Sequence, residues 1–259
     1  MINHSSFNPF VTMKKLNAII TLCLTLFTTI SCSSSNDSTS ANATESTPKS
    51  QSFDADCLYA YMPKYNELLT LEMIQAHYKG DMSKSEMKYR KSEKISGQST
   101  DKCIYSWGSD RIRKMDMMGV KMELPEPNEI GIQWLGNDLF MIKGLSTSLE
   151  NFQQYYRNIT KEEADEAFAK AEKIVQEKEG VSAEDAKTAT SIGKGLADGQ
   201  TFEKVEGVGE AATWVTKENH LVVLVGEKTF QIVANVGADK EANKNLAIAL
   251  AKEVLAKCK

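Results

Sequence analysis

The clearest pattern of hydrophobic and polar positions lies in the last third of the chain. The segment His220–Val225 is almost wholly apolar, Gly226–Lys228 has the composition of a tight turn, and apolar and polar residues alternate through Thr229–Val236. Side chains two positions apart share one face of a strand, so this alternation indicates strands with one buried face. Together with Ala212–Val215, these segments predict an antiparallel meander.

Helical spacing marks several other segments. Apolar residues recur every three to four positions through Lys240–Lys257, which predicts a terminal helix lying across the sheet. A shorter helix is expected over Thr70–Lys79, where Gly80 ends the pattern. A capping-box sequence begins at Thr160, and Ser182–Asp198 predicts a weaker helix because it contains several glycines.

The first half of the folded part contributes further strands. Cys103–Trp107 is a short strand pattern, and Ile130–Ile142 predicts a hairpin that turns at Gly136–Asp138. Residues 81–102 are polar and rich in lysine, which indicates a loop or a long hairpin arm. We therefore expect an α+β fold, with an antiparallel sheet, helices packed on it, a helical insertion over 146–200 and a C-terminal helix.

The N-terminus has the pattern of an export signal. Lys14 and Lys15 precede the apolar run Leu16–Ile30, which is too short and wrongly flanked for a stable membrane span. The small residue before Cys32 resembles the lipobox of bacterial lipoproteins, and that resemblance implies cleavage before Cys32 and diacylation of its thiol. A plain secretory signal or an uncleaved anchor is the alternative. The signal is expected over residues 1–31, with Met13 as a second candidate start.

A polar segment follows the expected lipidation site. Residues 32–52 are rich in Ser, Thr and Asn and contain too few apolar residues to form a core, so we expect a flexible tether with a root-mean-square span of about 25 Å. Ser33 after the cysteine favours the outer membrane by the usual sorting logic of Gram-negative envelopes. We expect residues 53–259 to form a single domain.

Composition and charge narrow the class of protein. Hydrophobic residues make up 41% and charged residues 25% of the chain, which is typical of a globular protein. Removing residues 1–31 takes away two lysines and no acid, leaving 29 basic against 35 acidic residues and a net charge of −6. This negative charge argues against a nucleic-acid partner. It also leaves membrane attachment to the acyl chains, so the expected partners are the membrane and a protein or apolar ligand.

Three cysteines remain after the signal and the lipidated residue are set aside. Disulfides persist in an exported, oxidising compartment, and Cys57, Cys103 and Cys258 allow three different single bridges. We favour Cys57–Cys103, which closes a 47-residue segment. Cys258 then stays as a buried free thiol on the core side of the terminal helix, and the alternative is that it pairs with one of the other two.

A set of short motifs resembles a known group of proteins. They are Leu68-Leu69-Thr70, Cys103-x-Tyr105-x-Trp107 and the run from Gly207 to Trp214 that follows a Gly-x-Gly-x-x-Ala-x-Trp pattern. The order is similar to that of small exported bacterial lipoproteins of unknown function. The resemblance implies an α+β sandwich like that of the photosystem accessory protein PsbP, and no agreed activity. Two departures are the position of Cys57, eleven residues before Leu68, and the inserted helical segment over 146–200.

Motifs for catalysis and for cofactors do not assemble in the sequence. His77 and His220 lie outside any metal-binding spacing, and the short glycine motifs lack the context of a nucleotide-binding loop. No nucleophile–histidine–acid arrangement can be built from the chain. We therefore expect a protein that is not an enzyme, without a cofactor and without a metal site of the usual kinds.

One segment stands out as a candidate surface. Four methionines, Met115, Met117, Met118 and Met122, cluster within Arg111–Glu123. Thioethers fill irregular gaps in a core, line adaptable grooves for apolar partners and bind Cu(I). The cluster therefore has three possible roles: packing of a β-arm, a surface for an apolar partner or ligand, and a copper site. The function that we expect is a membrane-anchored, non-catalytic binding module of the bacterial envelope, with copper handling by this cluster as the alternative.

Overall fold

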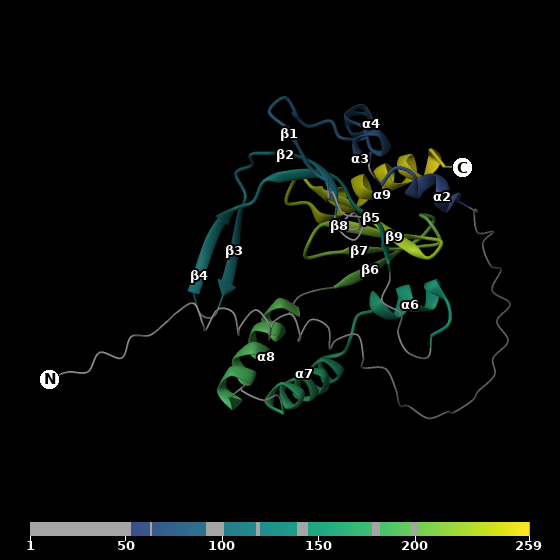
Figure 1. The fold of residues 1–259 in the computed structure, drawn as a ribbon. Coiled ribbons are helices and arrows are strands. Elements are labelled where there is room, and N and C mark those ends of the chain that lie inside the picture. The colour runs from purple at the N-terminus through teal and green to yellow at the C-terminus, as the bar shows by residue number, and fades with distance from the viewer. Residues whose placement is uncertain are drawn as a thin grey trace. The chain divides into compact units, whose positions relative to one another are not determined.

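The computed structural model describes residues 53–62, 64–91, 101–117, 120–138, 145–177, 182–197 and 201–258 (Figure 1). The expected signal, Cys32 and the expected tether lie outside the described residues. The chain divides into two compact units. The larger unit lies within Asn36–Arg157 and Gln200–Lys259, and the described part of the smaller unit lies within Asn158–Gly199.

An antiparallel sheet of seven strands forms the centre of the larger unit. In spatial order its strands are β1 (Glu86–Arg90), β2 (Lys102–Trp107), β5 (Asn128–Asp138), β9 (Lys228–Asn235), β8 (His220–Val225), β7 (Ala211–Val215) and β6 (Phe202–Val205). The expected meander is confirmed as β7, β8 and β9, which pair in succession. With the helices described next, the sheet confirms the predicted α+β class.

The expected terminal helix is confirmed as α9 (Lys240–Ala256), which packs on β8 and β9 (Figure 1). Asp239 caps its first turn by accepting hydrogen bonds from two backbone N–H groups. The helix expected near residue 70 is α4 (Leu71–His77), which lies against α9 and is capped by Thr70. Short helices α2 (Ala55–Tyr59) and α3 (Tyr65–Leu68) precede it.

Both faces of β8 are covered, and the expectation of one buried face was wrong. Leu221, Val223 and Val225 belong to the main core together with residues of α9. Val222 and Leu224 point to the other face, where they form a second cluster with Phe152 of α6 (Ser148–Tyr155). A strand that is buried on both faces has a continuous run of apolar residues in its sequence, and β8 has such a run.

Strand β5 replaces the hairpin that was expected at Gly136–Asp138. It continues to Asp138 and pairs with β9 on both sides of an irregularity between Gln133 and Asn137. Within that irregularity Trp134 has a φ of 57° and Gly136 a φ of 75°. The glycine therefore belongs to a β-bulge, whose composition resembles that of a turn. Residues 139–142, the expected second strand, lie outside the described residues.

The smaller unit consists of two helices in its described part. They are α7 (Lys161–Gln176) and α8 (Ala183–Ala197), and they pack against each other. The expected capping box is present, because Thr160 and Glu163 each accept a backbone hydrogen bond from the other residue. The described part of the segment 146–200 thus consists mainly of helices, as expected, and its first helix, α6, belongs to the larger unit. Among the described residues, no helix has both the length and the apolarity to span a membrane.

Candidate binding surface around the β3–β4 arm

The methionine-rich segment forms a two-stranded antiparallel ribbon, the arm, made of β3 (Ile112–Met117) and β4 (Val120–Pro125) (Figure 1). In its register Met115 stands opposite Met122, and Met117 stands opposite Val120. Three of the four candidate methionines are thereby brought together. Met118 lies outside the described residues.

The register separates two kinds of position along the arm. Alternation places five apolar residues at positions of one face, which we call the apolar face: Met115, Met117, Val120, Met122 and Leu124. Arg113, opposite Leu124, shares this face at the base of the arm. At the base of this face Leu124 is 45% exposed. The positions between them carry charged residues from Lys114 to Glu123, where Lys114 forms an ion pair of 3.3 Å with Glu123, and Ile112 and Pro125 at the base. The arm is therefore an amphipathic ribbon beyond its base.

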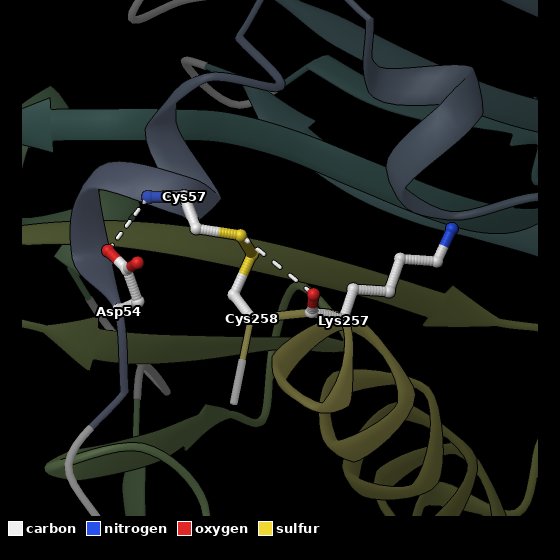
Figure 2. The surroundings of a disulfide bond; sticks show 4 residues. All are labelled: Asp54, Cys57, Lys257 and Cys258. Carbon is white, nitrogen blue, oxygen red and sulfur yellow. Dashed lines mark hydrogen bonds between the residues drawn. A yellow bond between two sulfur atoms is a disulfide. The ribbon is translucent and has the colours of Figure 1, made fainter.

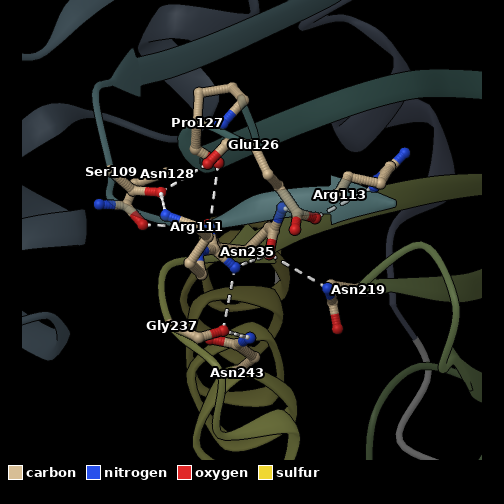
Figure 3. A network of polar contacts seen from close by, with 10 residues as sticks. All are labelled: Ser109, Arg111, Arg113, Glu126, Pro127, Asn128, Asn219, Asn235, Gly237 and Asn243. Atoms are coloured by element: carbon tan, nitrogen blue, oxygen red, sulfur yellow. Dashed lines mark hydrogen bonds and ion pairs between the residues drawn. The ribbon is translucent and has the colours of Figure 1, made fainter. Parts of the chain in front are cut away.

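Arg111 holds the base of the arm (Figure 3). Its Nη1 donates to Asn235 Oδ1 at 2.6 Å and to the Gly237 carbonyl at 3.0 Å. Its Nη2 donates to the Pro127 and Asn235 carbonyls and to Asn128 Oδ1, at 3.0, 2.8 and 3.1 Å. A planar guanidinium has donors in a fixed fork, so these bonds set the position of β3 relative to the main sheet.

Glu126, the residue that follows β4, completes this base. Its Oε1 accepts from Asn235 Nδ2 and from Arg113 Nη2, both at 3.1 Å. Burial raises the pKa of the Glu126 carboxyl, but the hydrogen bonds from Asn235 and Arg113 and the charges of Arg113 and Arg111 outweigh it, so the pKa is lowered. Glu126 is therefore ionised at neutral pH and forms an ion pair with Arg113.

An open depression of about 660 Å³ lies beside the base of the arm. Its walls come from the segment between α4 and β1, the end of β2, the segment leading into β3, the start of β5 and the segment between β9 and α9. The lining residues are Lys84, Trp107, Gly108, Ser109, Asp110, Arg111, Asn128, Val236, Gly237 and Ala238. The indole of Trp107 is half-buried and packs on Tyr78, with 5.7 Å between ring centroids. A Cβ added at Gly108 or Gly237 would meet no atom within 4 Å, so both glycines border open space.

The disulfide joins Cys57 to Cys258, which corrects the expected Cys57–Cys103 pair (Figure 2). The two Cα atoms are 5.6 Å apart, within the usual range for a disulfide. The Asp54 backbone N–H donates to the Cys258 carbonyl at 3.0 Å and holds the end of α9 beside α2. The expectation that Cys258 is buried is confirmed, but not that its thiol is free.

Cys103 is the free cysteine of the described residues, and it is buried on β2. Its strand neighbours are Tyr89 on β1 and Ile132 on β5. Burial raises the pKa of its thiol to about 11, so the thiol is protonated and unreactive at neutral pH. The sheet surrounds Cys103 with paired strands, which explains why it has no cysteine partner.

The histidines occupy structural positions. His77 Nε2 lies 3.1 Å from Glu253 Oε1, which joins α4 to α9. Burial lowers the pKa of His220 to about 4, and Glu218, 3.5 Å from its Nδ1, is 61% exposed and screened by water. Among the described residues, no three His, Cys, Asp or Glu side chains are grouped so that they could hold a metal ion.

The parts of this surface that the sequence did not reveal are Arg111, Asn235 and Trp107. Arg111 and Asn235 are separated by 124 positions, and no local pattern links them. The Gly108-Ser109-Asp110 run next to Trp107 is a turn-like signal that could have marked the depression. No family model, curated protein or solved structure matches the chain.

Proposed function

We propose that the protein is a lipid-anchored, non-catalytic module of the bacterial envelope that binds a partner protein through the apolar face of the arm. The observation that carries this proposal is the register of β3 and β4, which gathers five apolar positions on one side of a ribbon, with Arg113 at its base. Apolar surface that lies together outside a core is typical of binding sites. Methionine suits such a surface because its unbranched thioether adapts to the shape of a partner.

The base of the arm supports the same proposal. A two-stranded ribbon alone is marginally stable in water, so it needs an external support to present a fixed surface. Arg111 gives that support through five hydrogen bonds to the main sheet and its loops. A rigid element lowers the entropy that is lost on binding.

Anchoring at Cys32 is the second half of the proposal. The lipobox-like sequence and the polar segment after it support an acylated cysteine followed by a tether of about 25 Å. Replacing Cys32→Ala should release the protein from the membrane fraction of bacterial cells. Persistence of the variant in that fraction would contradict lipidation.

Photo-crosslinking tests the partner surface in intact cells. A photoreactive residue at Leu124 on the apolar face should give a discrete product with one partner, and the same residue at neighbouring Glu123 on the charged face should not. Arg111→Lys should reduce the yield at position 124, because lysine lacks the planar fork that positions the arm. Equal products at both positions, or none at position 124, would contradict the proposal.

Copper handling is the second candidate function, and the facing Met115 and Met122 favour it together with Met117 on the same face. Thioethers are soft ligands that prefer Cu(I) to harder ions. Titration with Cu(I) should show one tight site that is lost when these three residues and Met118 are replaced by leucine. An unchanged stoichiometry in that variant would exclude the candidate.

A further inference from the structure

The depression beside Trp107 differs in chemistry from the apolar face of the arm. One wall is the half-buried indole of Trp107, whose other contacts include Tyr78. The rim carries the exposed charged residues Lys84 and Asp110, and Asn128 adds an amide. An aromatic wall with a few polar groups around it is the usual composition of a small-molecule site.

The two exposed charges on the rim of the depression, Lys84 and Asp110, are of opposite sign. Arg111 also lines the depression, but its two terminal nitrogens already make five hydrogen bonds within the fold, so these donors are engaged before a ligand arrives. An anion would meet Asp110 and a cation would meet Lys84, so a neutral ligand is favoured over either.

The ligand must also match an aromatic face and several hydrogen-bonding groups at once. A pyranose ring has a face of C–H groups that packs on an indole and a rim of hydroxyls that both donate and accept. Lys84 donates, the Asp110 carboxylate accepts and the Asn128 amide can do both. We propose that the depression binds a neutral saccharide, with one sugar ring lying on Trp107 and its hydroxyls on these polar groups.

The size and shape of the depression agree with this ligand. Its volume of about 660 Å³ lies within the range of small-molecule sites, and it is open on one side, so a chain longer than one ring can extend out of it. At Gly108 and Gly237 the walls carry no side chain, and a Cβ added there would meet no atom within 4 Å. This proposal depends neither on the lipid anchor nor on the apolar face of the arm.

Calorimetric titration of the full chain tests the proposal, in a detergent without a sugar headgroup. The probes are the neutral trisaccharides chitotriose and maltotriose, with citrate as an anion and spermidine as a cation. At least one trisaccharide should bind, and its affinity should change less than about twofold between low salt and about 0.5 M salt, because a neutral ligand is not screened. Binding of neither trisaccharide would overturn the proposal.

Filling the depression gives the sharpest variant. Gly108→Leu places a side chain in open space without touching the core and should weaken saccharide binding about tenfold or more. Lys252→Leu is the matched control, because it adds the same exposed side chain near the far end of α9, about 18 Å along the helix from Lys240. Equal affinity of the two variants would contradict the site. Trp107→Phe should keep part of the binding, whereas Trp107→Ala should lose it.

The rim charges separate the saccharide from ionic ligands. For a neutral saccharide, Asp110→Ala and Lys84→Ala should each weaken binding about three- to tenfold, because each removes a hydrogen-bond partner. If the site is built for an anion, Asp110→Ala should strengthen citrate binding instead. If it is built for a cation, Lys84→Ala should strengthen spermidine binding. Either result would overturn the proposal.

Discussion

Removal of the disulfide between Cys57 and Cys258 is expected to change the free energy of unfolding strongly. The disulfide ties the first described helix to the last, across a sequence separation of 201 residues. The backbone hydrogen bond from Asp54 to the Cys258 carbonyl also joins these two segments, and reduction of the disulfide removes neither its donor nor its acceptor. The main effect of reduction is therefore to release the unfolded chain from a long loop.

The size of the effect follows from the length of that loop. In the chain-entropy model, closing a loop of about 200 residues stabilises the folded state by about 5 kcal/mol at 25 °C. This is comparable to the whole free energy of unfolding of many domains. The expected Cys57–Cys103 bridge would have given about 4 kcal/mol, so magnitude alone does not distinguish the two pairings.

Urea unfolding with and without a reductant provides the assay. In a background of Cys23→Ser and Cys32→Ser, the reductant should lower the free energy of unfolding of the parent protein by about 5 kcal/mol. Cys258→Ser should already be destabilised and should no longer respond to the reductant. Cys103→Ala is the matched control, because it removes only a small buried group, costs about 1 kcal/mol and should keep the full response.

Two results would refute the pairing. One is a response to reductant that survives in Cys258→Ser, which would leave Cys57 and Cys103 as the bridge. The other is a response that disappears in Cys103→Ala. As an independent check, thiol labelling of the parent in urea without reductant should modify Cys103 alone among the three.

Three further predictions concern pH, packing and the base of the arm. Unfolded His220 takes up a proton near pH 6.5 and folded His220 near pH 4, so the free energy of unfolding should fall by about 3 kcal/mol as the pH drops through this window. His220→Gln should flatten this decline, measured as urea midpoints against pH, and an unchanged pH profile would contradict the burial argument. Gly131→Ala should lower the free energy of unfolding by about 3 kcal/mol in thermal unfolding, because its Cβ would lie 2.2 Å from a β2 carbonyl oxygen. Gly108→Ala should lower it by almost nothing, and similar losses in the two variants would be inconsistent with the register. Arg111→Lys should cost about 2 kcal/mol in urea unfolding at neutral pH, and full stability of this variant would show that the fork is dispensable.

Elements with a strong local period could be predicted from the sequence. The spacing of Leu246, Leu250 and Val254 indicates α9, and the alternation in Thr229–Val236 indicates β9. The pair Thr160 and Glu163 indicates the start of α7. In each case the signal lies within a few residues, because backbone hydrogen bonds and side-chain periodicity act over that range.

The bulge in β5 shows where local signals fail. The composition around Gly136 is that of a hairpin turn, and the positive φ of this glycine agrees with a turn. Pairing with β9 on both sides of the bulge nevertheless keeps the strand continuous to Asp138. A bulge and a turn need the same conformational freedom of glycine, so only the partner strand distinguishes them.

The sequence by itself determined the α+β class, most of the helices and the meander, and it singled out the methionine segment. Only the tertiary structure decided that Cys258 pairs with Cys57, that both faces of β8 are covered, and that Arg111 meets Asn235 at the base of the arm. The physical reason is the range of the interactions. Periodicity and capping act between neighbours in the chain, whereas a disulfide, a core and a hydrogen-bond network join residues that only the folded topology brings together.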